Sequence, residues 1–282
     1  MTTDWTPSAR QVERHRVARR LKRRRALISV AITVAVLGAA VAVLVSSPGW
    51  SRVQETFLSW DHATESFPLV LDGFWVNVKM FLIAEPLILL VGILVAVTRS
   101  TITPWLAPLR LVAILYTDLL RGVPTLLVVA LCALGIPALG LVGVTTSLFW
   151  LSVFALVLSY GAYVAEVIRS GIESVHPTQL ASAEALALSR SQAMRFVILP
   201  QALRRVVPPL MNDFVSLQKD TSLISYVGVV EALRAATDYG NYNFNFTPLV
   251  VAAALFVALT VPLARFTDYL SRRAAKRMWG RA

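Results

Sequence analysis

The sequence predicts an all-α, polytopic membrane protein with about six transmembrane helices. Of its 282 residues, 56% are hydrophobic and only 15% are charged, whereas a soluble domain has about 25% charged residues. The mean hydropathy is +0.65. The apolar stretches are each close to the ~20 residues that an α-helix needs to cross a bilayer. Arginines and lysines gather beside these stretches, which is the pattern that orients a chain in a membrane.

The N-terminal segment, residues 1–25, is polar and ends in the basic run RRLKRRR. The apolar run that follows is long for the core of a secretory signal, and the next residues lack a convincing A-x-A cleavage site. We therefore predict a basic cytoplasmic segment over residues 1–25, followed by an additional, uncleaved transmembrane helix over residues 26–46. The net charge of +11 indicates orientation and attraction to anionic membrane lipid rather than binding to nucleic acid.

Five further spans follow from the same pattern. The segment 46–72 is acidic and is expected outside the membrane, whereas the short loop with Arg99 and Arg110, the polar segment 171–209 and the tail 273–282 are basic. Six spans place every basic cluster on one side, so both termini are expected in the cytoplasm of a multi-pass inner-membrane protein. The five expected spans are residues 73–97, 111–133, 147–168, 206–230 and 248–270.

The long polar segment 171–209 reads as two short helices with a break between them. Pro177 suits the first position of a helix, which is expected to end near Leu188. The sequence from Ser189 to Gln192 has the form of a capping box that starts the second helix. That helix must bend or stop at Pro200, with a further interruption at residues 208–209. The first helix is rich in small residues, so it either docks against another protein or lies on the membrane surface.

Ionisable residues within the spans are costly and therefore informative. Lys79 is expected to snorkel to the outer interface, whereas Glu85 either lines a solute pathway or faces a polar interior. Arg121 precedes Gly122 and Pro124, a combination that disturbs a spanning helix; it either binds a substrate carboxylate in a bidentate manner or pins a kink at the interface. The fifth span is the most polar, so it lines the route or packs against a partner subunit; its polar residues are Asn212, Asp213, Gln218, Lys219 and Asp220.

Glu166 and Arg169 lie three residues apart near the end of the fourth span. This spacing predicts an i,i+3 pair, and we favour a structural ion pair over a gate. No nucleotide-binding loop of the form GxxxxGK[ST] is present, so the chain is not expected to be an enzyme that hydrolyses ATP itself. Three scattered histidines and the single Cys132 suggest neither a metal site nor an internal disulfide.

Residues 179–202 resemble the cytoplasmic "EAA" loop of permease subunits of bacterial ATP-binding-cassette (ABC) importers, in the polar amino acid branch. The family register places Ala181 at the glutamate and Ala187 at the glycine of that motif, so both signature residues are replaced; Glu184, on the same helical face, can supply a carboxylate. Further similarity lies in three other blocks, and the resemblance covers about residues 70–272. The blocks are residues 116–124, 160–172 and 212–223.

The resemblance implies a permease subunit of an importer for a polar amino acid or a related small polar solute. Its expected partners are separate cytoplasmic ATPases that use the ATP, a second permease subunit that is either a copy of this chain or a different one, an extracytoplasmic solute-binding protein and membrane lipid; no nucleic acid and no cofactor of its own are expected. The implied ATPase-coupling residues are Gln179, Ala181, Ala183, Glu184, Ala187, Ser189, Gln192, Leu199 and Pro200. The translocation-path candidates are Glu85, Arg121, Asn212, Gln218, Lys219 and Asp220.

Two alternatives from other classes stay open at this point. The first is a self-sufficient secondary transporter or channel whose 171–209 segment merely lies on the membrane. Secondary transporters often show an internal repeat, and none is evident in this sequence. The second is a membrane scaffold that transports nothing, against which the polar fifth span argues.

Overall fold

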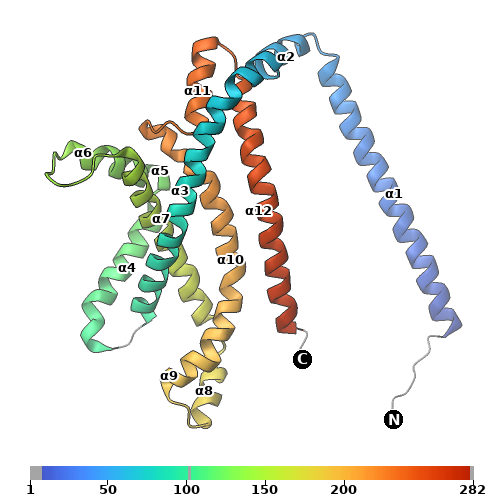
Figure 1. Cartoon of the computed structure of the whole chain (residues 1–282). Helices are drawn as coiled ribbons and strands as arrows, with labels where there is room; N and C mark the ends of the chain where they lie inside the picture. The colour runs from blue at the N-terminus through green and yellow to red at the C-terminus, as the bar shows by residue number, and fades with distance from the viewer. Residues whose placement is uncertain (1–7, 101–102, 280–282) are drawn as a thin grey trace. The chain divides into compact units, whose positions relative to one another are not determined.

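The computed structural model describes residues 8–100 and 103–279, and all regular structure in these ranges is helical. The all-α fold class is therefore confirmed. The chain divides into two compact units, Met1–Thr56 and Phe57–Ala282. Figure 1 shows the helices with their labels.

The first unit consists mainly of α1 (Ala9–Val45), one unbroken helix of 37 residues. Ser8 caps its start in a capping box with Gln11. The predicted basic segment and the predicted additional span thus share one continuous helix. Its part from Val17 to Val45 is apolar enough to cross a membrane, and none of its most apolar window is buried. After a turn, α2 (Trp50–Phe57) leads towards the second unit.

The second unit begins with α3 (Trp60–Ser100), which is the longest helix of the described residues at 41 residues. It contains the predicted span 73–97 but starts earlier, so residues 60–72, which we expected in a loop, are helical. Tertiary contacts hold this extension in place: the Tyr239 hydroxyl lies 3.0 Å from His62 Nδ1 and donates to Glu65 at 2.8 Å. Local composition alone does not report such partners.

The third predicted span, residues 111–133, is not one straight helix. After a 3₁₀ turn at Pro104–Leu106, α4 (Ala107–Gly122) is followed by α5 (Thr125–Ala130), a π-helical turn (Leu131–Gly135) and the short α6 (Ile136–Ala138). The two halves are bent by 108°. Val123 takes an extended conformation, as expected before a proline, and Pro124 has no N–H to continue the helix. The disturbance expected at residues 121–124 is therefore present.

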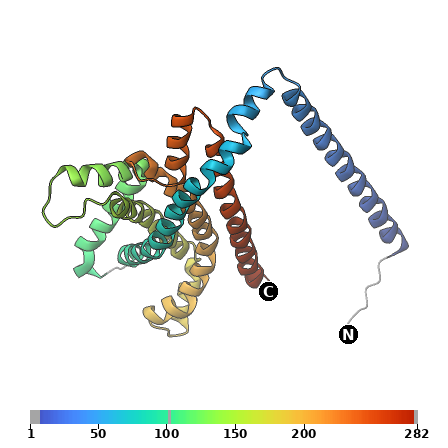
Figure 2. The ribbon, with the colours of Figure 1, turned by 45° about the horizontal axis from the view of Figure 1, so that its top comes forward.

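The centre of the second unit is α7 (Leu148–Glu173), which packs most extensively against α3, and Figures 1 and 2 show the two helices side by side. Two thirds of its most apolar window (67%) is buried. Its small residues let the helices approach closely. At Gly92 of α3, an added Cβ would lie 2.3 Å from Val164 Cγ1. The main hydrophobic core lies along this contact and includes Met80, Ile88, Val129, Leu156 and Leu217.

The remaining helices are α8 to α12. The segment 171–209 contains α8 (Pro177–Ala185), α9 (Arg190–Ala193) and a π-helical turn (Met194–Ile198), and it leads into α10 (Leu199–Asp220). A 3₁₀ turn (Thr221–Val227) and α11 (Ala232–Asn243) connect α10 to α12 (Thr247–Trp279). Residues 208–209, expected to interrupt a helix, lie inside α10, whose backbone continues through both prolines.

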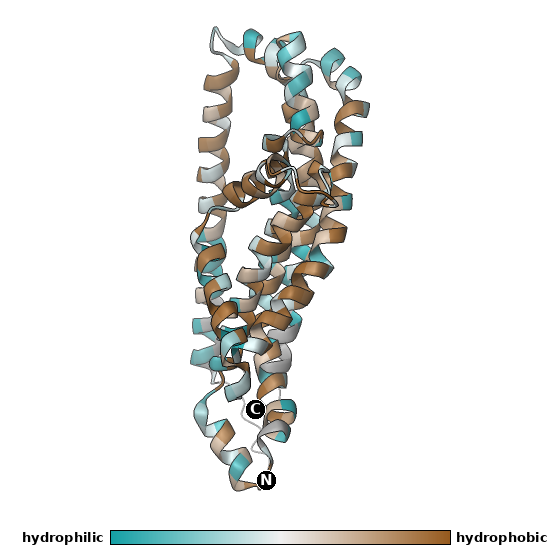
Figure 3. Cartoon of the chain, turned by 90° about the vertical axis from the view of Figure 1, so that its left-hand side faces the viewer, coloured by the Kyte–Doolittle hydropathy of each residue, from teal (hydrophilic) through white to brown (hydrophobic). Residues whose placement is uncertain are grey.

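The number of membrane-crossing helices depends on α10. By length and composition the described residues hold four such helices, or five when the bent pair α4–α6 counts as one span. The predicted fifth span, residues 206–230, corresponds to α10 and the turn after it, and polar residues keep this helix out of the apolar set. Figure 3 shows hydrophobic residues along the middle of the long helices and hydrophilic ones towards their ends.

Candidate functional site

The 171–209 segment forms the two short helices that its sequence predicts, at the lower end of the second unit in Figure 1. Pro177 is the first residue of α8, as expected. His176 caps this helix, because its Nδ1 accepts a hydrogen bond from the Thr178 N–H at 3.3 Å. The helix ends at Ala185, three residues before the predicted end at Leu188.

The early end of α8 has a clear local cause. The Leu188 N–H donates to the Ala183 carbonyl at 3.1 Å and the Ala187 N–H donates to the Glu184 carbonyl at 2.9 Å. This pair of bonds is the Schellman motif, which requires a left-handed residue just after the helix. Ala187 fills that position with φ +56°. Glycine is the usual residue there, since a Cβ in the left-handed region costs about 1 kcal/mol.

The second helix starts with the predicted capping box. The Ser189 N–H donates to Gln192 Oε1 at 2.8 Å, and the Gln192 N–H donates to Ser189 Oγ at 3.3 Å. The π-helical turn then precedes Leu199 and Pro200, so the expected disturbance at Pro200 takes the form of a widened turn at which α10 begins. Such a turn accommodates the missing proline N–H without ending the helical path.

Contacts at its base hold the 171–209 segment as a compact unit. Gln201 Nε2 donates to Gln179 Oε1 at 3.2 Å and joins α8 to α10. Arg205 donates to Ser174 Oγ at 3.0 Å. A small core of Val175, Ile198 and Ala202 lies between these bonds. The segment can therefore move as a body rather than as a flexible loop.

The exposed surface of this segment combines charged residues with small and large apolar ones. Ala181 and Glu184 are exposed, whereas Ala183 is buried against the base. Leu186 is 77% exposed and Phe196 is 64% exposed. Large exposed side chains beside small ones form a surface suited to a protein partner.

A cluster of charges lies where α3, α4 and α7 meet; we call it the Glu166 cluster (Arg99, Thr117, Arg121, Glu166, Arg169 and Glu173). Glu166 Oε2 accepts from Arg99 Nη1 at 2.9 Å and lies 3.6 Å from Arg121 Nη1. Its Oε1 accepts from Arg169 Nη2 at 2.5 Å. Arg99 also donates to Thr117 Oγ1 at 2.6 Å. The predicted pair of Glu166 and Arg169 is present, but it is part of a larger network.

A second cluster joins α3 to the start of α11; we call it the Glu231 cluster (Asn77, Thr221 and Glu231). The Asn77 amide donates to Glu231 Oε2 at 3.0 Å and to Thr221 Oγ1 at 3.2 Å. Glu231 also caps α11 by accepting from the Leu233 and Arg234 N–H groups at 3.0 and 2.8 Å. Our sequence analysis missed this cluster, although a polar Asn77 inside an apolar span was an available signal.

Acidic groups of α3 and α10 and a tyrosine of α7 lie in one region of the second unit. Glu85 of α3 is partly buried and lies within electrostatic range of Asp213 of α10. Tyr160 of α7, which the analysis did not single out as a site residue, donates its hydroxyl hydrogen to Asp220 Oδ2 at 2.7 Å. Glu85, Asp213 and Asp220 thus come from two helices that line one region with α7.

Other predicted path residues lie apart from this region. Gln218 is buried, and its Oε1 accepts from Thr260 Oγ1 of α12 at 2.6 Å. Asn212 and Lys219 are exposed on α10, and Lys79 is exposed on α3. Arg121 belongs to the Glu166 cluster. Within the described residues, Asp213 Oδ2 and Gln218 Nε2 are buried without a hydrogen-bond partner, which marks α10 as a helix with unused polar capacity.

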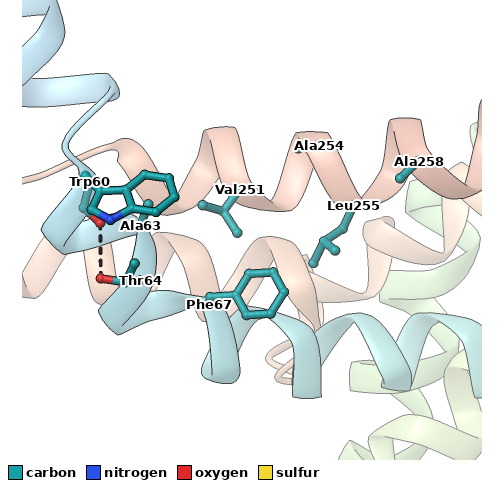
Figure 4. A pocket seen from close by; sticks show the side chains of 8 residues that line it. All are labelled: Trp60, Ala63, Thr64, Phe67, Val251, Ala254, Leu255 and Ala258. Carbon is teal, nitrogen blue, oxygen red and sulfur yellow. Dashed lines mark hydrogen bonds between the residues drawn. The ribbon is translucent and has the colours of Figure 1, made fainter.

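A groove between the start of α3 and α12 has a different character. It measures about 540 Å³. Figure 4 shows Trp60, Phe67, Val251 and Leu255 along it, with the Thr64 hydroxyl bonded to the Trp60 carbonyl. Its lining carries no charged side chain, so the groove does not suit a charged or strongly polar solute.

Comparison with known proteins identifies the family. The profile described as "Binding-protein-dependent transport system inner membrane component" matches residues 63–276. This chain belongs to that family. Members are transport components of ABC importers, so this chain is a permease subunit rather than an enzyme.

Curated relatives of this permease cover most of its length. It is 28% identical over 77% of its residues to the "Arginine transport system permease protein ArtQ" of Bacillus subtilis, of which 97% is covered. It is 32% identical over 75% of its residues to the "Probable glutamine ABC transporter permease protein GlnM" of the same organism, of which 96% is covered.

Solved structures agree with this assignment. A chain from the crystal structure of an amino acid ABC transporter with histidines matches 74% of this permease with a TM-score of 0.68 and 29% identity, and 96% of that chain is covered. A chain of the MetNI methionine ABC transporter in an inward-facing conformation matches 73% with a TM-score of 0.60, and 96% of that chain is covered; at 18% identity this similarity supports the fold alone.

Ala187, which the resemblance set at the glycine of the "EAA" motif, lies two residues after the end of α8 and has a positive φ. A non-glycine residue is strained in that conformation. The glutamate position of the motif, Ala181, is exposed, and so is Glu184.

Proposed function

We propose that this permease subunit carries a polar amino acid or a related small polar solute across the cytoplasmic membrane. A second permease subunit, either a copy of this chain or a different one, completes the path. The observation that carries the proposal is the set of polar groups on α3, α7 and α10 (Glu85, Tyr160, Asp213 and Asp220). Tyr160 and Asp220 bond one another and Asp213 Oδ2 is buried without a hydrogen-bond partner, and ionisable residues inside membrane spans mark solute pathways. The names of relatives, which include arginine and glutamine systems, support the solute class.

Energy comes from separate ATPase subunits in this proposal, and ATP binds to those partners. The 171–209 segment docks on an ATPase through α8 and its neighbouring apolar residues, and closure of the ATPases moves the segment as a body. Its compact base and its exposed Leu186 and Phe196 support this role. An extracytoplasmic binding protein delivers the solute on the opposite side.

The orientation follows from charge. Basic residues gather in α1 before residue 26, around the 171–209 segment and at the end of α12. Placing these clusters in the cytoplasm satisfies the positive-inside rule, so both termini are proposed to be cytoplasmic. Residues 1–7 and 280–282 lie outside the described residues. In this arrangement α1 anchors the subunit and its arginines contact anionic lipid.

The test is a pull-down from detergent of the intact chain and of the Glu184→Lys, Ala185→Trp variant, which changes the charge and bulk of the exposed α8 surface. We expect a nucleotide-binding ATPase to co-purify with the intact chain and to be lost with the variant. The matched control is Asp61→Lys, an exposed carboxylate at the far end of the second unit, which should retain the ATPase.

The solute is tested with the purified complex in vesicles that contain ATP, with a panel of radiolabelled polar amino acids. Uptake of at least one amino acid that stops when ATP is withheld supports the proposal. Uptake by the chain alone in vesicles without ATP would contradict it and would establish a secondary transporter instead.

A further inference from the structure

One carboxylate in this subunit contacts arginines from three helices. Glu166 of α7 accepts from Arg99 near the end of α3 and from Arg169 one turn further along α7, and it lies 3.6 Å from Arg121 near the end of α4. A single arginine would be enough to neutralise the Glu166 carboxylate. The Glu166 cluster therefore does more than neutralise a charge, since it ties α3 and α4 to α7.

The contacts to Glu166 differ in strength. The Arg99 side chain is 11% exposed and also bonds Thr117 of α4, so this contact is short and largely dry. The Arg121 side chain is 40% exposed and its contact with Glu166 is longer. Long, partly hydrated arginine side chains can follow a moving carboxylate, whereas a short buried bond resists separation. The cluster thus combines a firm contact with an adjustable one.

The position of the adjustable contact is informative. Arg121 is the last residue but one of α4, directly before the break at which the chain turns by 108° into α5. At the other side of the contact, Glu166 lies seven residues before the end of α7, which is about 10 Å of helix. The 171–209 segment begins within the last turn of α7, and Arg205 of α10 donates to Ser174, the residue directly after α7.

We propose that Glu166 is a positioning residue that transmits displacement of the 171–209 segment to the break between α4 and α5. This inference rests on the proposed coupling to ATPase subunits. When the segment moves, the rigid end of α7 carries Glu166 with it. Arg99 and Arg169 follow because separation would leave charges without partners in a poorly hydrated place, whereas the more exposed Arg121 follows through the attraction of opposite charges. Arg121 then pulls on the last turn of α4, and the break at residues 122–124 absorbs the rotation.

The central test uses the complex of this permease with its ATPase in vesicles, and it measures the solute transported per ATP hydrolysed. Glu166→Gln keeps the shape but removes the charge that holds the arginines. We expect this variant to hydrolyse ATP while the transport ratio falls about fivefold or more. The matched control is Asp238→Asn on α11, because Asp238 is an exposed carboxylate that pairs with Arg234 outside the Glu166 cluster; it should keep the ratio.

A second variant keeps the test decisive if Glu166→Gln does not assemble. Arg121→Gln removes only the exposed, longer contact and should leave folding intact. We expect the transport ratio to fall while KM for the solute is unchanged, and Arg121→Lys to restore part of the ratio.

Two results would overturn the inference. One is an unchanged transport ratio in Arg121→Gln; the other is a rise in KM at constant ratio, which would make Arg121 a solute-binding residue. Failure of the intact complex to link uptake to ATP would instead contradict the proposed function itself.

Discussion

Glu231, which is buried, and Glu166, which is partly buried, are two carboxylates that join helices in different ways. Glu231 has no exposed surface and is satisfied by uncharged donors, which are the Asn77 amide and the first N–H groups of α11. The Glu166 side chain is 18% exposed and is satisfied by three charged guanidinium groups. Both carboxylates join helices. The groups that donate to Glu231 are backbone N–H groups and a short amide side chain, whereas those that donate to Glu166 lie at the ends of long arginine side chains.

The difference indicates which end of the unit is built to be rigid. A fully buried network with uncharged donors holds one geometry, because every hydrogen bond is lost when the helices part. An ionic cluster with partial exposure can exchange partners or water at lower cost. We infer that the α3–α11 contact is the fixed end of the permease, and that the end with the 171–209 segment is the movable one.

The largest expected effect comes from a substitution at the α3–α11 contact. At Gly73 of α3, an added Cβ would lie 2.6 Å from the Glu231 carbonyl carbon, so Gly73→Ala must push α11 away. We expect a loss of about 3 kcal/mol in the free energy of unfolding, measured by thermal unfolding in detergent. Gly135→Ala is the control, since nothing lies within 4 Å of a Cβ there, and it should change little. If the two variants have the same free energy of unfolding, α11 accommodates the added methyl group and the α3–α11 contact is not rigid.

The second prediction compares how salt changes the contribution of the two clusters to the free energy of unfolding. Glu166→Gln should lower the free energy of unfolding by about 1.5 kcal/mol at low ionic strength, and by less in 1 M salt, because partly exposed charges are screened. Asn77→Ala removes the uncharged partner of Glu231 and should cost about 2 kcal/mol at both salt concentrations. Thermal unfolding in a salt series measures both. The same salt dependence in the two variants would remove the distinction between the clusters.

The smallest expected effect concerns the backbone strain of Ala187 in the 171–209 segment. Ala187→Gly should raise the stability of the 171–209 segment by up to about 1 kcal/mol, because glycine adopts the left-handed conformation without a Cβ clash. Ala185→Gly, two residues earlier at the end of α8, is the matched control and should lower stability by up to about 1 kcal/mol. Hydrogen exchange of the α8 amides measures both. Destabilisation by both substitutions would contradict the left-handed geometry at Ala187.

Several local features of the fold could be predicted from the sequence, because their causes lie within a few residues. The start of α8 at Pro177, the capping box of Ser189 and Gln192, and the break after Gly122 each depend on a missing N–H or a side chain that reaches its own backbone. The i,i+3 contact of Glu166 and Arg169 is local in the same sense. The end of α8 was placed late because good helix formers continue past Ala185, while the chain closes a Schellman motif at Ala187.

The sequence by itself determined that this chain is helical, crosses a membrane several times and carries a polar segment between its spans, because bilayer thickness, backbone hydrogen bonding and charge act on each segment separately. Only the tertiary structure decided which apolar helices face protein. In their most apolar windows α12 and α7 are both hydrophobic enough to span, yet within the second unit α12 is 6% buried and α7 is 67% buried. It also decided that Arg99 and Arg121 meet Glu166, and that Asn77 meets Glu231, at separations from 45 to 154 residues. Contacts across such distances depend on how whole helices pack, which no local pattern encodes.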